Sequence, residues 1–363
     1  MSAIRYRIVI VGPSVSRISG SSLRTLNIWY SLSSFSKLQV EYLQVDKAAL
    51  ILHYLGTILT ADLVIVSGVN PWIAAMVTFL RRLGARRTLV DFHGFSYMEV
   101  LYTRSGSLYR LLLLACERVA YRLATHVVVA SPWLARVFRD YFGDRDIQVI
   151  ENTVSSLFRY IVKRLMKIPK DVLVRVACKT ISEDICRYKV ILVSPLPDIF
   201  VANVLAYKQL VSLKDDINGE TLVIITGVRG ISKQSQDNVI VAGYLPYTLY
   251  VLLLNISHGI LLPYPNTAIC GGARNKVLES GYICTPLYST KTGVLHLPLK
   301  PWEHYVPVDN LEKLRDILRD PKSTMASRIA SNLCSIIERR YVFENFKKSL
   351  LTYLLRLLRS AKI

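Results

Sequence analysis

Two charged residues in the C-terminal half, Lys276 and Glu279, stand where they could act together on a ligand. Their spacing of three places both side chains on one face of a helix. Gly271-Gly272 precede them, so the backbone can approach a ligand closely, and the N–H groups of a helix beginning there favour an anion. The lysine could neutralise phosphate and the glutamate could accept hydrogen bonds from ribose hydroxyls, which suits a nucleotide sugar. A surface helix with an ordinary Lys–Glu pair is the alternative.

His93 is a second candidate. It follows the apolar run 87–92 in Asp91-Phe92-His93-Gly94. The carboxyl end of a parallel strand is where ligands bind such sheets. An imidazole there could act as an acid or base, or donate to a sugar hydroxyl. A semi-buried histidine with only a structural role is an equal alternative.

Small residues follow the first apolar run, in Gly12-Pro13-Ser14 and Ser19-Gly20-Ser21-Ser22. They would let a ligand approach the backbone, although a turn with serine caps is an equal interpretation. The dinucleotide pattern G-x-G-x-x-G is missing there. Asp144-Arg145-Asp146 superficially matches a metal-holding D-x-D, but such charges in a short polar loop are most simply solvated. We therefore expect no metal.

The composition predicts a globular protein with an anionic partner. The 363 residues suffice for two domains, and 52% of them are apolar. A net charge of +20 implies nucleotide phosphates, nucleic acid or an anionic membrane face. The basic clusters lack the interleaved aromatic residues of a single-strand-binding surface, so we expect no nucleic acid.

The six cysteines show no C-x-x-C spacing, and most lie in apolar runs. They predict small buried side chains in a reducing compartment and no zinc, although some heat-adapted organisms keep intracellular disulfides. The N-terminus does not resemble a signal peptide, and no uncharged apolar run reaches a membrane-spanning length. We therefore expect a cytoplasmic protein.

The elements that must position these residues alternate between short β-branched runs and helix-like stretches, which indicates βαβ units and parallel sheets. The expected strands are 6–12, 38–44, 62–67, 87–92, 126–130, 147–151, 189–194, 220–227, 238–242, 258–262 and 284–288. The expected helices are 22–34, 47–59, 71–83, 106–124, 132–142, 199–213, 246–255, 273–282, 309–319, 322–338 and 343–360.

The pattern predicts an N-terminal domain over 1–152 and a C-terminal domain over 189–340. Residues 153–188 break the alternation and are expected to form a linker with one helix and a further strand. The tail 341–363 carries an apolar helical stripe. Two doubly wound halves result, which bind ligands at the carboxyl ends of their strands.

Taken together, these residues resemble family 4 (group 1) glycosyltransferases. The resemblance implies the α/β GT-B fold, in which two Rossmann-like, doubly wound parallel-sheet domains face a cleft, with the tail helix crossing back to the first domain. The matching segments are the loop 19–22, Asp91 to Gly94, Glu117 followed by 126–131, Glu151-Asn152-Thr153 in place of Pro-Asn-Gly, Gly243-Tyr244-Leu245, Lys276-x-x-Glu279 and Pro286.

The resemblance implies a retaining, hexosyltransferase-type reaction with a nucleotide-sugar donor, without an obligatory metal or other cofactor. His93 would contact the sugar and the reacting centre, Glu279 the ribose, and Lys276 and Arg274 the diphosphate. The implied donor-binding residues are Gly20, Gly243, Tyr244, Leu245, Cys270, Gly271, Gly272, Arg274, Asn275, Lys276 and Glu279.

Three departures from the family pattern leave a rival function open. A second glutamate eight residues before Glu279 is replaced by Gly271, a glycine two before Pro286 by Cys284, and the Arg and Lys-Gly pair is missing from 194–200. The rival is a non-catalytic scaffold protein that binds nucleotide sugars on the same fold. A sugar-nucleotide epimerase is a third option, but the added carboxylate pair that it would need is missing.

The expected acceptor is a glycan or a lipid-linked molecule, reached by peripheral association with the inner face of an anionic membrane. The motivation is the net charge together with helix 71–83, where apolar residues are followed by arginines. The residues expected to face lipid are Trp72, Ile73, Met76, Val77 and Leu80. The alternative is that this side of the helix packs on the sheet.

Overall fold

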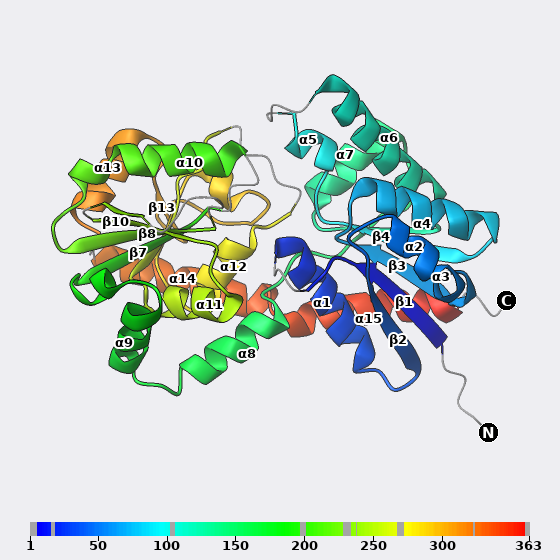
Figure 1. Cartoon of the computed structure of the whole chain (residues 1–363), viewed down its shortest axis with the longest axis horizontal. Helices are drawn as coiled ribbons and strands as arrows, with labels where there is room; N and C mark the ends of the chain where they lie inside the picture. Colours follow the sequence, from blue (N-terminus) through cyan, green and yellow to red (C-terminus); the bar gives the residue numbers. More distant parts are fainter. Residues whose placement is uncertain are drawn as a thin grey trace. The chain divides into compact units, whose positions relative to one another are not determined.

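The computed structural model describes residues 6–15, 19–101, 106–196, 201–227, 234–236, 238–266, 272–321 and 324–359 (Figure 1). The chain divides into two compact units. The first unit consists of Met1–Ser156, Cys270–Ala273 and Tyr341–Ile363. The second unit consists of Leu157–Ile269 and Arg274–Arg340.

The first unit is built on a six-stranded parallel sheet in the order β2-β1-β3-β4-β5-β6. Its strands are β1 (Tyr6–Gly12), β2 (Leu38–Gln44), β3 (Leu63–Ser67), β4 (Arg87–Phe92), β5 (His126–Val129) and β6 (Gln148–Val149). Its helices are α1 (Gly20–Ser33), α2 (Ala49–His53), α3 (Leu55–Thr60), α4 (Pro71–Leu83), α5 (Ser96–Glu99), α6 (Ser107–Leu123), α7 (Pro132–Phe142) and α15 (Phe343–Arg359).

Strand β1 explains why this sheet is apolar on both faces. Successive side chains of a strand point to opposite faces. Val9 and Val11 enter a core cluster with α4, α6 and α7, whereas Ile8 and Ile10 enter a second cluster with α1 and α15. Helices therefore cover both faces, as in doubly wound folds.

The second unit contains a seven-stranded sheet in the order β13-β12-β11-β7-β8-β10-β9, parallel except for the pair β9–β10. Its strands are β7 (Val190–Pro195), β8 (Thr221–Thr226), β9 (Gln234–Gln236), β10 (Val239–Gly243), β11 (Gly259–Leu262), β12 (Leu287–Ser289) and β13 (Val306–Pro307). Its helices are α8 (Ser156–Leu165), α9 (Lys170–Thr180), η1 (Glu183–Cys186), α10 (Val201–Ser212), η2 (Lys214–Asp216), α11 (Tyr247–Ile256), α12 (Asn275–Tyr282), η3 (Lys291–Val294), α13 (Leu311–Arg319) and α14 (Thr324–Arg340).

Residues 157–188 differ from the expected linker. They form α8, α9 and η1 and belong to the second unit. No strand occurs among them. The short amphipathic helix α8 buries only Phe158 and Val162, so its apolar signal is too sparse to stand out among its lysines and arginines.

Four cysteines are paired, and the expectation of reduced, unpaired side chains is wrong for them. Disulfides join Cys178 to Cys186 and Cys284 to Cys334. Cys116 is a free thiol. The pairing depends on chain segments brought together by folding, since one pair is separated by 50 residues. Spacing along the sequence does not reveal such a pair.

We expect reduction to destabilise the protein, mainly through Cys284–Cys334. Closing a loop of this length restricts the unfolded chain and contributes about 4 kcal/mol in the chain-entropy model. Urea unfolding with and without reductant, and of Cys334→Ser, measures the effect, with Cys116→Ser as the control for loss of a thiol. Thiol titration of the denatured protein should gain four groups on reduction. An equal thiol count before and after reduction would show that the pairs do not form.

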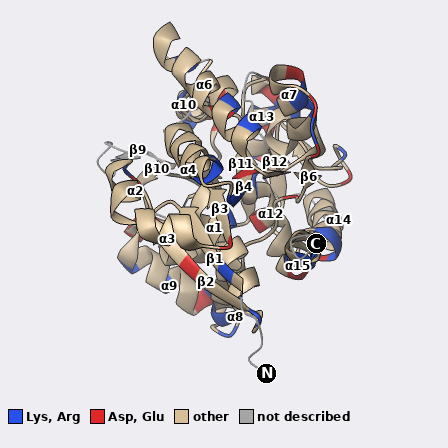
Figure 2. Cartoon of the chain, turned by 90° about the vertical axis from the view of Figure 1, so that its right-hand side faces the viewer, with Lys and Arg blue, Asp and Glu red and all other residues tan. Residues whose placement is uncertain are grey.

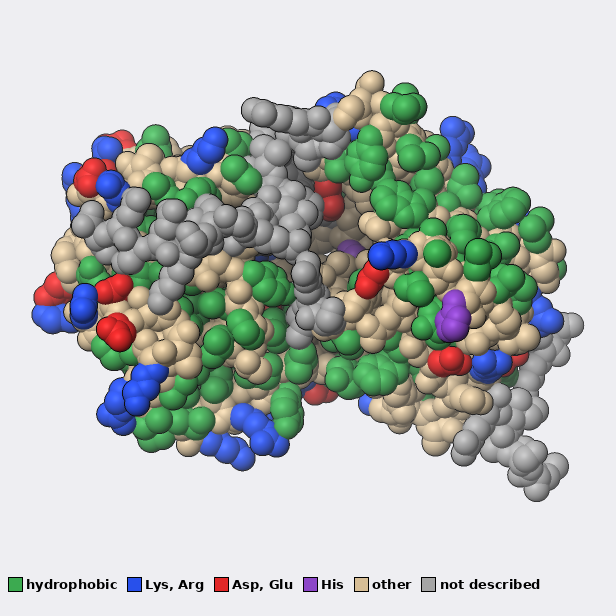
Figure 3. Space-filling model, in the orientation of Figure 1, with side chains coloured by type: hydrophobic (Ala, Val, Ile, Leu, Met, Phe, Trp, Pro, Cys, Tyr) green, Lys and Arg blue, Asp and Glu red, His purple; other side chains and the backbone are tan. Residues whose placement is uncertain are grey.

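Helix α4 turns its predicted lipid-facing side towards the core. Ile73 and Val77 are fully buried, and Trp72, Met76 and Leu80 pack against the same cluster. The alternative interpretation of this face is therefore correct. Lys and Arg residues are scattered over many elements (Figure 2). Hydrophobic side chains nevertheless remain on the surface of the region formed by α4, α6 and α7 (Figure 3). Within the described ranges, every helix is too short or too polar to span a bilayer.

Candidate functional site

A buried ion pair lies at the carboxyl end of β4 in the first unit. Asp91 ends the apolar run of this strand, and Arg24 reaches it from α1. The Arg24 Nε atom donates to both Asp91 oxygens, at 3.1 and 2.9 Å, and Nη2 donates to Oδ1 at 2.7 Å. Ser67 Oγ donates to Oδ2 at 2.8 Å. Burial acts to raise the pKa of Asp91, but the Arg24 guanidinium, the neighbouring His93 and the hydrogen bonds from Arg24 hold this pKa well below the ordinary value.

His93 lies beside this pair without sharing it. Its Nδ1 atom is 3.9 Å from Asp91 Oδ2, which is beyond hydrogen-bond distance. Nδ1 is buried and has no hydrogen-bond partner among the described residues, while 22% of the side chain remains exposed. The imidazole is therefore partly open to solvent and keeps polar capacity for a ligand.

Glycine leaves room beside His93 for a side chain from α5. A Cβ atom at Gly94 would meet the carboxyl group of Glu99, so this flexible side chain would have to move. The turn continues into α5, whose first N–H groups donate hydrogen bonds to Glu117 on α6. The Glu117 carboxyl group accepts from the N–H of Ser96 at 2.7 Å and from that of Tyr97 at 3.2 Å. These contacts fix the backbone that presents His93.

The Glu117 carboxyl group makes stability depend on pH. Burial raises its pKa from 4.5 to about 7, and the charge of Glu99 adds to the rise, although the two backbone hydrogen bonds oppose it. The folded chain therefore keeps this proton at pH values where the unfolded chain loses it. The folded state is penalised as the pH rises through this window, by about 3 kcal/mol in total.

We expect the unfolding free energy of the wild type, relative to Glu117→Gln, to fall as the pH rises from about 5 to about 8. The glutamine does not titrate, so the difference isolates the carboxyl group. Urea unfolding at several pH values measures it. Parallel pH profiles for the two proteins would contradict the raised pKa.

Asn152 connects the first-unit network to the residues directly before α12. Its Oδ1 atom accepts from Arg24 Nη1 at 2.9 Å, and its Nδ2 atom donates to the carbonyl of Ala273 at 2.9 Å. A Cβ atom at Gly272 would lie 2.9 Å from Ala130 Cβ and 3.0 Å from Asn152 Nδ2, so glycine permits this close approach. The backbone at 272–273 is thereby held in place just before the predicted donor-binding helix begins.

Glu279 is buried in the second unit and is engaged by two tyrosines of α11. Only 3% of the residue is exposed. Its carboxylate accepts from Tyr250 Oη at 2.7 Å and from Tyr247 Oη at 3.3 Å. Burial raises the pKa of Glu279, while the tyrosine hydrogen bonds and the charge of Lys276 oppose the rise. Glu279 is therefore not part of an ordinary surface Lys–Glu pair.

Two cations gather around one buried tyrosine in the loop after β11. Lys276 Nζ donates to Tyr264 Oη at 2.6 Å, and the Arg274 guanidinium lies over the Tyr264 ring, 4.2 Å from its centroid. Tyr264 itself is only 1% exposed. A ring face and a phenol oxygen thus hold both cations near the start of α12, where backbone N–H groups favour an anion.

The three tyrosines that contact these charged residues were not expected from the sequence. Tyr247 and Tyr250 are three residues apart and share one face of α11, which is the only signal that could have found them. Tyr264 lies in the loop 263–266, where no sequence pattern indicates a role for it. Their roles depend on contacts between segments that are distant in sequence.

The remaining predicted site residues are divided between the two units. Gly20 begins α1 behind a serine capping box formed by Ser19 and Ser22, so the serine caps expected at this turn are present. Gly243 ends β10 with a φ of +65°, and the Tyr244 side chain is 47% exposed. Leu245 follows them, and Asn275 is the first residue of α12. Cys270 and Gly271 lie outside the described residues.

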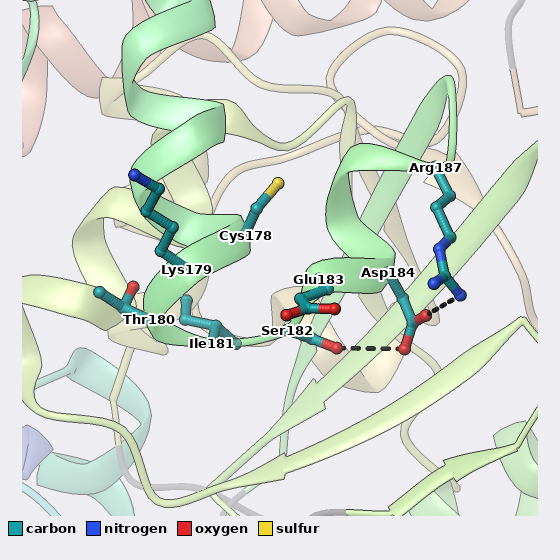
Figure 4. Close-up of a pocket in the computed structure, with 8 residues that line it drawn as sticks. All are labelled: Cys178, Lys179, Thr180, Ile181, Ser182, Glu183, Asp184 and Arg187. Atoms are coloured by element: carbon teal, nitrogen blue, oxygen red, sulfur yellow. Dashed lines mark hydrogen bonds and ion pairs between the residues drawn. The ribbon is translucent and has the colours of Figure 1, made fainter.

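A surface depression in the second unit contains none of the predicted residues. It lies between the end of α9 and η1 (Figure 4). Asp184 is one of the residues that line it. The Asp184 carboxylate accepts from Ser182 Oγ at 3.1 Å and from Arg187 Nη1 at 2.9 Å. The depression therefore plays no part in the site proposed below. In the ranges that the structure covers, no three His, Cys, Asp or Glu side chains are grouped as metal ligands.

Residues 7–156 match the family model described as Glycosyltransferase Family 4. No curated protein sequence matches the chain. Among solved structures, HepE of Anabaena in complex with UDP-glucose has a TM-score of 0.69 at 12% identity, covering 96% of this chain and 99% of its own. Sucrose-phosphate synthase of Thermosynechococcus elongatus has a TM-score of 0.65 at 13% identity, covering 98% of this chain and 100% of its own.

A structure with a different activity is also similar. UDP-GlcNAc 2-epimerase of Neisseria meningitidis, bound to UDP-GlcNAc, has a TM-score of 0.58 at 12% identity, covering 96% of this chain and 100% of its own. At such identities these likenesses establish the fold alone. The predicted GT-B class, with two parallel-sheet α/β domains, is confirmed. The choice of reaction needs a further argument from the residues.

Proposed function

Because residues 7–156 match the model of family 4 glycosyltransferases and the chain has the GT-B fold, we propose that this protein transfers a sugar from a nucleotide-sugar donor to a glycan or lipid-linked acceptor. The proposal includes retention of the anomeric configuration and independence from metal. HepE, with its bound UDP-glucose, supports a uridine nucleotide as the first donor to test.

One observation carries the proposal. Arg274 and Lys276 converge on Tyr264 at the start of α12, while Glu279 lies buried on the same helix. In the proposed arrangement the cations and the helix N–H groups bind the diphosphate and stabilise it as it leaves. Glu279 accepts from ribose hydroxyls. The backbone at Cys270, Gly271 and Gly272 contacts the sugar.

The other proposed residues complete the donor and acceptor sides. Gly243, Tyr244 and Leu245 lie near the nucleotide base, and the small residues around Gly20 let a ligand approach the first unit. His93 contacts the sugar at the reacting centre, and the partial exposure of its imidazole supports this role. No cofactor takes part.

The test is incubation with UDP, GDP and ADP sugars, with and without cell-extract acceptors, while released nucleoside diphosphate is measured. Release that depends on acceptor, persists with EDTA and gives a product with the anomeric configuration of the donor supports the proposal. Donor binding without release favours the non-catalytic scaffold. Conversion of the free nucleotide sugar to an epimer favours a sugar-nucleotide epimerase. The similarity to an epimerase structure is the reason to include this measurement.

Association with the inner face of the cell membrane belongs to the same proposal. The net charge of +20 supports it, because the cytoplasmic leaflet is anionic. The two disulfides would then have to persist in a reducing compartment. Intracellular proteins of some heat-adapted organisms do keep disulfides.

A further inference from the structure

Helix α6 carries an apolar stripe on the side that faces away from the core. Its stripe residues are Leu108, Leu111, Leu112, Ala115 and Val119, at spacings that share one helix face. Leu108 is 80% exposed, Leu111 59% and Leu112 51%. The opposite side of the helix, with Leu113, Glu117, Ala120 and Tyr121, is buried. A surface helix normally presents polar residues to water, so this stripe is inverted.

Helix α4 extends this surface. It packs along α6, and it leaves Phe79 49% and Leu83 70% exposed at its outer side. Figure 2 shows α6 projecting beyond α4, and Figure 3 shows hydrophobic side chains gathered over this region. We call the α6 stripe together with Phe79 and Leu83 the leucine surface. An exposed apolar surface of this kind marks an interaction site.

The exposed charged residues of α4 and α6 are all positive. Arg118 and Arg122 continue the stripe of α6 at its C-terminal end, and Arg82 is exposed on α4. The two helices contain a single carboxylate, Glu117, which is buried. A second copy of the chain would bring arginine against arginine. An anionic lipid surface instead supplies phosphates for the arginines and an acyl region for the leucines.

We propose that α6 and α4 dock this protein on an anionic lipid bilayer, with the leucine surface entering the acyl boundary and Arg82, Arg118 and Arg122 contacting lipid phosphates. This inference deepens the proposed membrane association and rests on it for the identity of the partner. It replaces the face of α4 expected from the sequence, which is buried. The lipid-facing residues lie mainly on α6.

Vesicle co-sedimentation of the full chain tests the proposal. We expect the protein to sediment with phosphatidylcholine vesicles that contain phosphatidylglycerol at low salt, and to be released at high salt or from neutral vesicles. The triple variant Leu108→Ser/Leu111→Ser/Leu112→Ser should bind at least roughly tenfold more weakly, since binding scales with buried apolar area. Its matched control is Met166→Ser/Leu311→Ser/Met325→Ser, which removes three apolar side chains of comparable exposure, each 50% or more, from the second unit.

A second pair of variants tests the arginines. Arg118→Ser/Arg122→Ser should lose about fivefold in vesicle affinity per arginine at low salt. Lys163→Ser/Lys167→Ser removes the same charge from exposed positions near α8 and should lose less. Thermal unfolding confirms that each variant is folded.

Several outcomes would overturn the proposal. They are failure of the wild type to sediment with anionic vesicles, equal losses in the test and control variants, and a change from dimer to monomer in the leucine variant. The last would assign the leucine surface to a second copy. Donor binding and release of nucleoside diphosphate are measured separately, without vesicles. A failure of membrane docking can therefore be distinguished from a failure of the proposed sugar transfer.

Discussion

Replacing Glu279 with glutamine is expected to weaken nucleotide-sugar binding by roughly tenfold to a hundredfold, because hydrogen bonds to a charged group contribute about 1.5–3 kcal/mol. The glutamine keeps the shape of the side chain in its buried site but removes the charge that accepts from ribose hydroxyls. Calorimetric titration with the donor found in the nucleotide-sugar panel measures the change. Glu312→Ala, an exposed position on α13, is the matched control.

Tyr250→Phe separates a donor-binding role of Glu279 from a purely structural one. This substitution removes the 2.7 Å hydrogen bond to the carboxylate but no contact with ribose. We expect it to lower the unfolding free energy by about 1–3 kcal/mol, the cost of leaving a buried acceptor without its partner, and to change donor affinity little. If Tyr250→Phe weakens the donor as much as Glu279→Gln does, Glu279 acts only through its packing.

Because the pKa of Glu279 is raised, we also expect donor affinity in the same titration to depend on pH. The ionised carboxylate is the better acceptor of ribose hydroxyl hydrogen bonds. Because burial raises its pKa, donor affinity should fall as the pH is lowered through that value, and glutamine should abolish this dependence. A donor affinity that has the same pH dependence in both proteins would contradict the assignment.

The sheets could be predicted from the sequence because their strands are buried on both faces. The expected strand 6–12 coincides with β1, and the expected strand 87–92 with β4. Nearly continuous β-branched runs bounded by small residues leave little ambiguity. The short strands β9 and β13 were not expected, since two or three residues carry no period.

The chemistry of the sites could be predicted only in part, because buried polar partners come from distant segments. Lys276 and Glu279 are identified by their spacing, but Tyr264 and Tyr250 become their partners only in the folded second unit. The pairing of Arg24 with Asp91 spans 67 residues. An arginine near the start of a predicted helix is normally solvent-exposed, so nothing in the sequence signals its burial.

The Arg24–Asp91 pair also changes the interpretation of His93. A histidine next to an aspartate suggests an acid–base dyad, in which the carboxylate orients the imidazole. Here both Asp91 oxygens are already bound by Arg24, and Oδ2 also by Ser67. Asp91 therefore organises the ends of β3, β4 and α1, and His93 Nδ1, at 3.9 Å from Oδ2, is not hydrogen-bonded to it. The imidazole is better suited to donate to a sugar hydroxyl than to act as an Asp-assisted base.

His93→Ala is expected to lower turnover by about a hundredfold to ten-thousandfold, the range for a positioned acid, base or hydrogen-bond donor at a reacting centre. Donor affinity should change much less, because the interaction is made chiefly in the transition state. Release of nucleoside diphosphate gives the turnover, and calorimetric titration gives the affinity. His53→Ala, at an exposed position of the same unit, is the control.

Asp91→Asn shows whether a loss in His93→Ala comes from the imidazole or from the structure around it. Removing the charge of Asp91 leaves Arg24 buried and uncompensated, which costs about 3–5 kcal/mol of stability. Asp91→Asn should therefore lower the unfolding free energy strongly, whereas His93→Ala should lower it much less, since the ring is partly exposed and Nδ1 has no hydrogen-bond partner among the described residues. If His93→Ala turns over as fast as the wild type, or loses turnover only in proportion to stability, His93 does not act at the reacting centre.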